Sequence, residues 1–339
     1  MIEDHLKLFL DEAVKEAEIY HSFIGNIYSD IEEFVLRKGK RLASCSTLLT
    51  YIGYTGNLDE RILKVCVGIE LYRHAILVHD DLIDMDDTRR GGSTLHKRFM
   101  NSYRPYNNRF GEGASVFAGN IMYALAFRAI MNSGFSKDCI GKVLFLTSEG
   151  YRAVNESQIL DLLFEQKNVS VDEWIIMASK RAASLFKVTI LTGAILAGAP
   201  KSDLSLLGEA SENMGYSFDI QDDIIDSFAI KKDYGRSSCL DISKNKKPLH
   251  IIFTLHANYP QKSEALKCLL GKQFLSYGEK ELARSLLRES GGLDAAKQVS
   301  KSHAKKARRL LTQTNLSKDV KEFFNNFILY IEESLDWYK

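Results

Sequence analysis

Apolar residues recur at the three- and four-residue spacing of amphipathic helices through long stretches of the chain, such as 111–199, which holds no proline and no strand-like alternation. The breaks between these stretches are short and carry the glycine, asparagine and proline of turns. No linker composition divides the sequence, so we expect residues 1–339 to form a single domain. The pattern predicts an all-α fold with helices at 3–24, 27–37, 41–53, 58–85, 113–132, 137–165, 171–197, 202–230, 247–258, 262–271, 276–289, 292–315 and 317–336.

Two of these predicted helices carry aspartates in otherwise apolar segments, at 75–87 and at 216–228. Residues three, four or seven positions apart share one helix face, and this spacing relates two sets: Asp80, Asp84 and Asp87 with Asp81 beside them, and Asp219, Asp222, Asp223 and Asp226. Buried carboxylates without partners are unfavourable, so two facing acidic stripes would call for divalent cations. Oxygen ligands without nearby cysteine or histidine pairs favour Mg²⁺, which commonly shares its coordination shell with substrate phosphates.

Basic residues accompany both acidic helices and also occupy a glycine-containing turn. They are Arg89 and Arg90 after the first, Arg236, Lys244, Lys246 and Lys247 after the second, and Lys38, Lys40 and Arg41 in the turn. Arginine and lysine beside metal-binding carboxylates are typical of a diphosphate site, because they neutralise the part of the diphosphate charge that the metal does not. The irregular segments 88–112 and 231–246, which follow the acidic helices, are expected to form lids.

Composition excludes several other classes of protein. The formal net charge of +1 gives no reason to expect a nucleic-acid partner. Five cysteines, far apart and odd in number, are typical of reduced thiols. The first 18 residues form an acidic amphipathic segment and not a signal peptide, and no run approaches 18 apolar residues. We therefore expect a soluble cytoplasmic protein without a membrane span.

Several motifs together resemble those of trans-isoprenyl diphosphate synthases, the polyprenyl synthetase family. They are HDDLID and RRGGSTLH within 79–96, DIQDDIID at 219–226, KGKRL at 38–42, FAGN at 117–120, ESQILDL at 156–162 and KRAASLF at 180–186. The resemblance covers about residues 20–310. It implies the all-α isoprenoid synthase type I fold around a deep cleft, a homodimer, and about three Mg²⁺ ions per active site. It also implies condensation of isopentenyl diphosphate with an allylic diphosphate to give a linear, all-E prenyl diphosphate.

The resemblance implies roles for individual residues. Asp80, Asp84 and Asp222 would bind Mg²⁺, with Asp81 and Asp226 as further candidate ligands. The allylic diphosphate would be bound by Arg89, Lys180, Arg236 and Lys246, and the isopentenyl diphosphate by Lys40 and Arg90, with Arg41 beside them. Metals and cations would stabilise the leaving pyrophosphate, which also acts as the base for the final proton, so no side-chain nucleophile is required.

The sequence departs from the family pattern at four positions near the expected substrates. Ala43 stands where the family has arginine, and Arg73 stands where it has histidine or glutamine. Arg181 replaces a threonine and Asp219 replaces a glutamine. One arginine is thus lost and one gained around the isopentenyl diphosphate. Arg181 and Asp219 could pair with each other, or could indicate a changed acceptor or chemistry.

Three residues on the first acidic helix are expected to set the length of the product. Ile76, Ala75 and Tyr72 lie four, five and eight positions before Asp80, along the path that a growing chain follows in the family. An aromatic residue at position 75 typically stops relatives near C15, whereas alanine lets the tail pass to Tyr72. The main product is therefore expected to be C20 with some C25, unless another helix or a dimer partner sets the depth.

Two other functions compete with this hypothesis. A terpene synthase on the same fold would ionise one prenyl diphosphate, but it has no need for the second diphosphate site suggested by Lys40, Arg73 and Arg90. A noncatalytic partner subunit would gain nothing from two complete acidic motifs, because buried acids are unfavourable. The sequence alone does not name the preferred allylic substrate.

Overall fold

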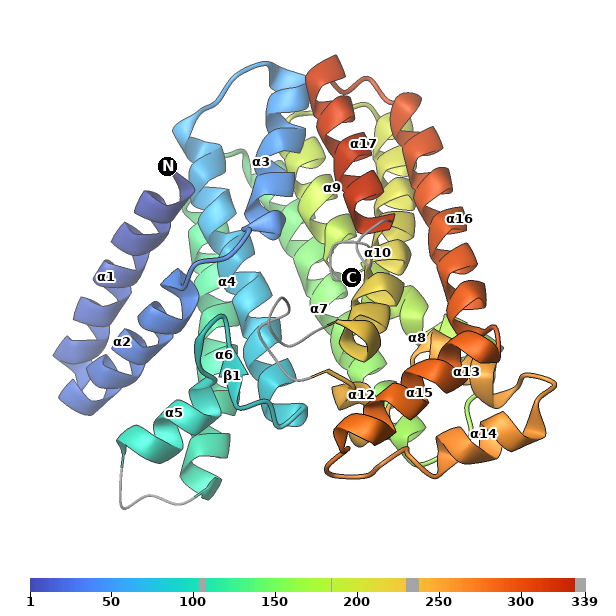
Figure 1. Cartoon of the computed structure of the whole chain (residues 1–339). Helices are drawn as coiled ribbons and strands as arrows, with labels where there is room; N and C mark the ends of the chain where they lie inside the picture. Colours follow the sequence, from blue (N-terminus) through green and yellow to red (C-terminus); the bar gives the residue numbers. More distant parts are fainter. Residues whose placement is uncertain (104–107, 184, 230–237, 333–339) are drawn as a thin grey trace. The chain divides into compact units, whose positions relative to one another are not determined.

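The computed structural model describes residues 1–103, 108–183, 185–229 and 238–332, which are almost entirely helical (Figure 1). The predicted all-α fold is therefore confirmed. The chain divides into two compact units, of which the first comprises Met1–Thr147 with Thr189–Ala199 and the second Ser148–Val188 with Pro200–Lys339. Each unit has its own core and is described separately below.

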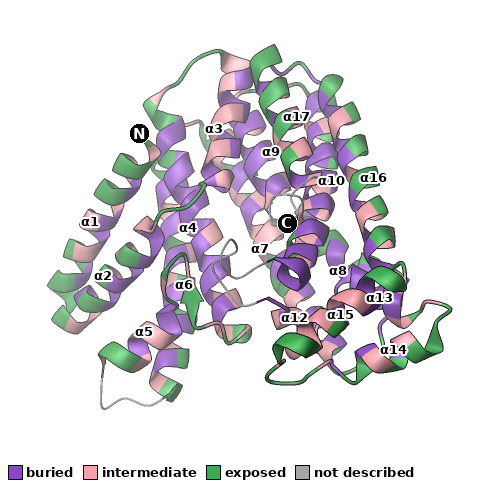
Figure 2. Ribbon diagram, viewed as in Figure 1, coloured by how far each residue is buried: buried purple, intermediate pink, exposed green. Residues whose placement is uncertain are grey.

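The first unit contains the first acidic helix and the basic turn. Its elements are α1 (Ile2–Tyr20), α2 (Ser22–Leu36), α3 (Leu42–Thr55), α4 (Glu60–Ile83), β1 (Thr88–Arg89), β2 (Gly92–Ser93), α5 (Leu95–Ser102), α6 (Asn108–Met131), the start of α7 (Lys137–Glu165) and most of α9 (Phe186–Leu196). Asp59 caps α4, because its carboxylate accepts from the backbone N–H groups of Arg61 and Ile62. Helix α4 is buried along most of its length (Figure 2).

Helix α4 packs lengthwise against α6, and two glycines permit the close approach. A Cβ atom added at Gly68 would lie 2.8 Å from the carbonyl oxygen of Ala126. A Cβ atom added at Gly119 would lie 2.2 Å from Nε2 of His79. A larger residue at Gly68 would push the backbone of α6 away, and one at Gly119 would displace the His79 ring, so close packing of α4 on α6 supports the acidic end of α4.

The second unit contains the second acidic helix. Its elements are the remainder of α7, the first residues of α9, and α8 (Val171–Ala183), α10 (Lys201–Phe228), α12 (Leu240–Ser243), α13 (Leu249–Leu255), α14 (Pro260–Lys267), α15 (Tyr277–Glu289), α16 (Gly292–Thr312) and α17 (Lys318–Glu332). Helix α10 packs against α16 and α8. Trp174, Ile220 and Ile224 lie in the core cluster of this unit and hold the acidic half of α10 in place.

The structure differs from the predicted elements in several places. The helix predicted at 3–24 ends at Tyr20, and α2 begins at Ser22 and not at residue 27. Asp87 lies beyond the end of α4, so it does not share a helix face with Asp80 as predicted. The expected irregular segment 88–112 contains a two-stranded hairpin, helix α5 and the start of α6. The single helix predicted at 171–197 is two helices, α8 and α9, although no glycine or proline marks the break. The segment 231–246 contains the short helix α12, and residues 230–237 lie outside the described part of the chain.

Among the described residues, α6 is the helix whose length and composition would allow it to span a bilayer. Helix α6 is the packing partner of α4, and Met122, Leu125, Ala126 and Ile130 are buried. Such a helix is equally typical of a protein core.

Candidate active site

The first acidic motif lies on the last turn of α4 and is partly neutralised by an arginine. Asp80 and Asp84 are half-buried, whereas Asp81 is buried. The Arg89 guanidinium donates from Nε to Oδ1 of Asp81 and from Nη2 to Oδ2 of Asp80, the latter at 3.3 Å. Burial nevertheless raises the pKa of Asp81 to about 7, although Arg89 opposes this shift. Its Oδ2 atom has no hydrogen-bond partner.

The hairpin that carries Arg89 and Arg90 is fixed to the end of α2 by Arg37. Nη1 of Arg37 donates to the carbonyl oxygens of Arg89, at 3.1 Å, and of Ser93, at 2.9 Å. The guanidinium occupies the space beside Gly92, where a Cβ atom would lie 2.5 Å from its Cζ. Glu33 on the preceding turn accepts from the other nitrogens of Arg37. Sequence reasoning missed this residue, because its contacts with the hairpin are 52 and 56 positions away along the chain.

Arg41 in the basic turn is held inside the protein and not at its surface. Its guanidinium donates to Glu70 at 3.1 Å, to Glu3 at 2.7 Å and to the carbonyl oxygen of Val35 at 2.9 Å. Glu70 is itself buried and also accepts from the hydroxyl and the N–H of Ser44. This saturated network anchors the turn on α4, while Lys40 next to it is exposed.

Arg90 lies in a region crowded with positive charge. Desolvation of its guanidinium, followed by the nearby charge of Arg41, lowers the pKa of Arg90, although residue 90 as a whole is exposed. Arg73 and Arg89 shift this pKa in the same direction, and Glu70 opposes them. Glu70 and Glu3 balance part of this positive charge, and a bound anion would balance more of it. The cluster therefore fits an anion, and it includes Arg73, one of the four departures from the family pattern.

The second acidic motif lies on α10 and is also bridged by an arginine. Arg181 of α8 contacts Asp219 through Nε at 3.4 Å and Asp223 through Nη2 at 3.2 Å. Burial alone would lower the pKa of Arg181, but the negative charges of Asp223 and Asp219 outweigh this effect and raise it above the ordinary value. Burial raises the pKa of Asp223, with Arg181 acting in the opposite direction. Asp222 is exposed on the same helix.

Two lysines that we expected to bind the diphosphate form ion pairs with carboxylates that sequence reasoning did not identify. Lys180 contacts Glu156, and Lys246 lies 3.4 Å from Asp161, so both acids come from the ESQILDL segment of α7. The presence of two acids in one quoted motif was the signal that could have identified them. Arg236, the remaining expected cation, lies outside the described residues.

Asp226, the last carboxylate of the second motif, is buried at 1% exposure and has a contact within its own unit. Its Oδ2 atom accepts from the backbone N–H of Asp241 at 3.1 Å, and its carbonyl oxygen accepts from the N–H of Cys239 at 2.7 Å. These bonds join the end of α10 to the start of α12. The geometry therefore gives Asp226 a structural role, which is to hold the segment around α12 against the end of α10.

The three residues expected to set product length are buried on α4. Tyr72 and Ala75 are fully buried and Ile76 is 7% exposed. The ring of Tyr72 lies 6.3 Å from that of Tyr123 on α6, measured between centroids. Tyr123 in turn packs on Phe127 at 4.6 Å. Tyr72 is thus backed by an aromatic pair on a neighbouring helix.

The carboxylates fit a hard divalent cation by their chemistry. Both motifs offer only oxygen donors, and Asp81 has a buried oxygen that lacks a hydrogen-bond partner. Within the described residues, no group of three acidic, histidine or cysteine side chains is gathered as a ready-made metal cage. Mg²⁺ is a hard cation of this kind and usually takes one or two carboxylates, completing its shell with water and phosphate.

Sequence comparison decides the family. Residues 26–287, more than three quarters of the chain, match the family described as polyprenyl synthetase. The chain belongs to the polyprenyl synthetase family. Within it, the chain is 28% identical to the short chain isoprenyl diphosphate synthase of Methanocaldococcus jannaschii, over 84% of its own length and 83% of that protein. The resemblance to trans-isoprenyl diphosphate synthases is thereby confirmed.

Solved structures of polyprenyl synthetases agree with the fold. The geranylgeranyl pyrophosphate synthetase of Pyrococcus horikoshii superposes with a TM-score of 0.82, at 26% identity and with 98% of each chain covered. The geranylgeranyl pyrophosphate synthase of Corynebacterium glutamicum, crystallised with isoprenyl diphosphate and magnesium, gives a TM-score of 0.90 at 21% identity, covering 98% of this chain and 97% of its own. The second likeness supports the fold alone.

The pairing of Arg181 with Asp219 leads to a prediction about this family member. In a double-mutant cycle of Arg181→Thr and Asp219→Gln, we expect a coupling of about 1–2 kcal/mol in the free energy of unfolding, because both side chains are about four-fifths buried. Denaturant titration of the four proteins measures this coupling. Effects that simply add, within about 0.5 kcal/mol, would contradict the pairing.

Proposed function

We propose that this chain is a prenyltransferase that condenses isopentenyl diphosphate with an allylic prenyl diphosphate to give a linear, all-E product, mainly C20 with some C25. Both units are proposed to act as one isoprenoid synthase domain. Membership of the polyprenyl synthetase family supports the reaction, and the archaeal relative named as a geranylgeranyl pyrophosphate synthetase supports the product class. The cytoplasm is the proposed location.

Asp80 and Asp84 on α4 and Asp222 on α10 are the proposed ligands of about three Mg²⁺ ions, with Asp81 and Asp226 as supporting carboxylates. When bound, Mg²⁺ would neutralise the diphosphate and make it a better leaving group. Asp80 and Asp84 are half-buried and Asp222 is exposed, so all three can offer oxygen atoms to an ion. Arg89, which contacts Asp80 and Asp81, would exchange these carboxylates for phosphate oxygens.

The cations of the proposed catalytic set would hold the allylic diphosphate. Arg89, Lys180, Lys246 and Arg236 have this role by resemblance to the family. Lys180 and Lys246 are oriented by the carboxylates of Glu156 and Asp161. Arginine and lysine so placed bind the diphosphate before cleavage and stabilise the charge that develops on it as the C1–O bond breaks. Arg181 and Asp219, already paired, would line the site as a neutral unit.

The single observation that carries the choice of reaction is the second group of cations around Arg90. A cyclase needs one diphosphate site, which the acidic motifs supply. The additional cluster of Arg90, Arg73 and the exposed Lys40 offers a second. Arg41 donates to Glu70 and Glu3, so we propose that it does not contact the substrate. Its proposed role is to hold the turn on which Lys40 lies.

A product assay tests this function directly. Purified protein is incubated with Mg²⁺ and dimethylallyl, geranyl or farnesyl diphosphate, with and without labelled isopentenyl diphosphate. Incorporation of label into a longer linear diphosphate is the expected result. Release of a hydrocarbon or alcohol without isopentenyl diphosphate would instead identify a cyclase, and the absence of any product would identify a noncatalytic subunit.

Arg73 provides a test of the second diphosphate site. Replacing Arg73 with alanine should raise the KM for isopentenyl diphosphate by an amount equivalent to about 1.5–3 kcal/mol, the loss of a charged hydrogen bond, with little change in the KM for the allylic substrate. Steady-state kinetics measure both constants. Arg61→Ala, an exposed arginine near the other end of α4, is the matched control. Equal effects on both substrates would show that Arg73 has another role.

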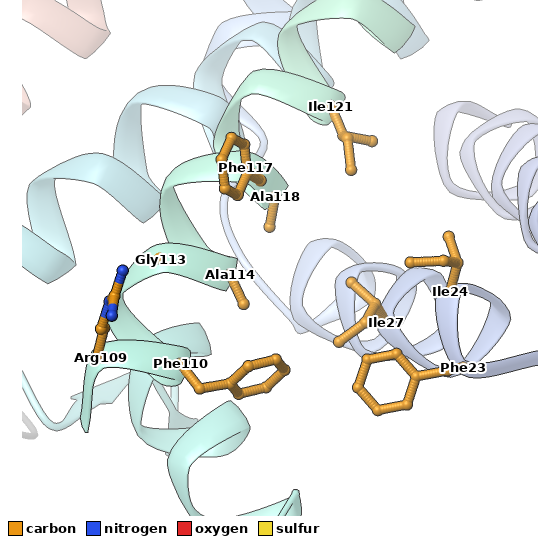
Figure 3. Close-up of a pocket in the computed structure, with 10 residues that line it drawn as sticks. All are labelled: Phe23, Ile24, Ile27, Arg109, Phe110, Gly113, Ala114, Phe117, Ala118 and Ile121. Carbon is orange, nitrogen blue, oxygen red and sulfur yellow. The ribbon is translucent and has the colours of Figure 1, made fainter. Parts of the chain in front are cut away.

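A homodimer is the proposed assembly, and the outward face of α6 is its proposed contact. Val116 and Phe117 are 41% and 67% exposed on this face. Phe117 lines an apolar cavity of about 510 Å³ between α2 and α6 (Figure 3), whose other lining residues are Phe23, Ile24, Ile27, Arg109, Phe110, Gly113, Ala114, Ala118 and Ile121. Apolar surface of this kind marks interaction sites. Light scattering of the wild-type protein and of Phe117→Glu measures whether this face joins two copies.

A further inference from the structure

The hairpin turn that carries Arg90 has a backbone conformation that an arginine seldom adopts. Thr88 pairs with Ser93 and Arg89 with Gly92, so Arg90 and Gly91 form a two-residue loop. Both have positive φ, 51° for Arg90 and 77° for Gly91. Tight hairpins of this type prefer asparagine, aspartate or glycine at both loop positions, because a larger side chain is strained there. A strained residue persists where its surroundings hold it and often where its side chain has a function.

One contact that holds the Arg90 side chain is made by the buried residue His74 of α4. Nη1 of Arg90 lies 3.1 Å from Nε2 of His74, and Nδ1 of His74 lies 2.7 Å from the carbonyl oxygen of Glu70. A carbonyl oxygen can only accept, so Nδ1 carries the proton. Burial lowers the pKa of His74 to about 4, which leaves the ring neutral at physiological pH. Nε2 is therefore an acceptor, and Arg90 donates to it.

The other side of the Arg90 guanidinium lies against the basic turn. A Cβ atom added at Gly39 would lie 2.8 Å from Cζ of Arg90, so the guanidinium occupies the space left by the missing side chain, next to Lys40. The His74 ring is fixed in turn by an edge contact with Phe34, with 5.9 Å between centroids. The guanidinium is thus confined between α4 and the turn, in the cluster of cations described above.

We propose that His74 is a positioning residue for the second diphosphate: its Nε2 atom accepts from the strained Arg90 and fixes it so that the guanidinium faces the isopentenyl diphosphate. The assignment rests on the proposed function. Glu70, one turn before His74 on α4, contacts both parts of this region: its side chain accepts from Arg41, and its carbonyl oxygen accepts from His74. One turn of α4 therefore orients both the basic turn and the hairpin.

Kinetics of three single variants and one double variant test this role. His74→Phe keeps a ring against Phe34 but removes the acceptor, and should raise the KM for isopentenyl diphosphate about tenfold, as expected for loss of a hydrogen bond to a charged group. The kcat and the KM for the allylic diphosphate should change less than about twofold. Arg90→Ala should show the same split. His74→Gln, whose side-chain oxygen can accept from Arg90, should recover most of the affinity.

The double variant separates positioning from a general structural effect. If His74 acts through Arg90, His74→Phe combined with Arg90→Ala should be no weaker than Arg90→Ala alone. Additive effects, or an equal loss for both substrates in His74→Phe, would overturn the proposal. If the wild-type protein makes no prenyl product, the proposed function fails, and calorimetry with inorganic pyrophosphate then tests the contact itself. Weaker pyrophosphate binding in both His74→Phe and Arg90→Ala supports the proposal, and unchanged binding in His74→Phe contradicts it.

Discussion

Replacing Asp84 with alanine is expected to lower kcat by at least about a hundredfold, because metal-assisted charge stabilisation is worth several kcal/mol and each tenfold in rate corresponds to about 1.4 kcal/mol. Asp84 is chosen because Arg89 contacts Asp80 and Asp81 instead, so its removal leaves those ion pairs in place. The fold should survive, since removing one carboxylate from an acidic cluster relieves repulsion. Steady-state turnover at saturating Mg²⁺ and circular dichroism measure the two effects.

A matched acid on the same segment serves as the control. Asp87 belongs to the same sequence motif but is exposed and pairs with Lys97 at 2.9 Å, so Asp87→Asn should retain most of the activity. The stricter test combines Asp84→Ala with Asp222→Ala, one carboxylate from each acidic helix. Full activity in that double variant would end the assignment of these residues to metal binding.

Changing Tyr72 or Ala75 is expected to change the length of the product. Both side chains are fully buried on α4, eight and five positions before Asp80. One helical turn rises about 5.4 Å, which is comparable to one isoprene unit. Tyr72→Ala should therefore lengthen the product beyond C20, and Ala75→Phe should shorten it towards C15. Chromatography of the dephosphorylated products measures the distribution.

The packing of Tyr72 on Tyr123 supplies the control for this prediction. If Tyr123 on α6, and not Tyr72, limits how far the product chain can extend, Tyr123→Ala should lengthen the product while Tyr72→Ala leaves it unchanged. Because Ala75 is fully buried, Ala75→Leu is included as a smaller step that strains the core less than Ala75→Phe. No shift in Tyr72→Ala and none in either Ala75 variant would show that the end of the path lies elsewhere.

Helix periodicity predicted what depends on residues close together in sequence. The span 58–85 differs from α4 by two residues at each end, because the apolar spacing and the Asp59 cap are both local. Helix α5 was missed because glycines and asparagines flank it. Leu95 and Phe99 are nevertheless buried, and α5 packs on α6. Tertiary packing outweighed the local turn signals there.

In the candidate site, too, the sequence predicted local features and not long-range contacts. The spacing of the aspartates correctly placed Asp219, Asp222, Asp223 and Asp226 on one helix, but α4 ends at Ile83, so Asp84 is its C-cap and Asp87 lies beyond it. The partners of the arginines were not predictable, because Arg41 meets Glu70 across 29 positions and Arg181 meets Asp223 across 42. Periodicity describes which face a residue occupies and contains no information on which distant side chain faces it. Arg41 therefore looked like a substrate ligand in the sequence and proves to be buried in ion pairs.

The anchoring of the hairpin by Arg37 has a consequence for how anions bind. Ordering a flexible loop opposes binding by roughly 1–2 kcal/mol per residue in lost conformational entropy. Residues 88–93 already form a hairpin whose strands are bonded to Arg37 at the end of α2, so little of this loss remains when a diphosphate binds. Affinity in this part of the protein then depends on desolvation of the arginines and on screening of their charge by salt. A preorganised anion site of this kind favours rapid capture of substrate over adaptation to its shape.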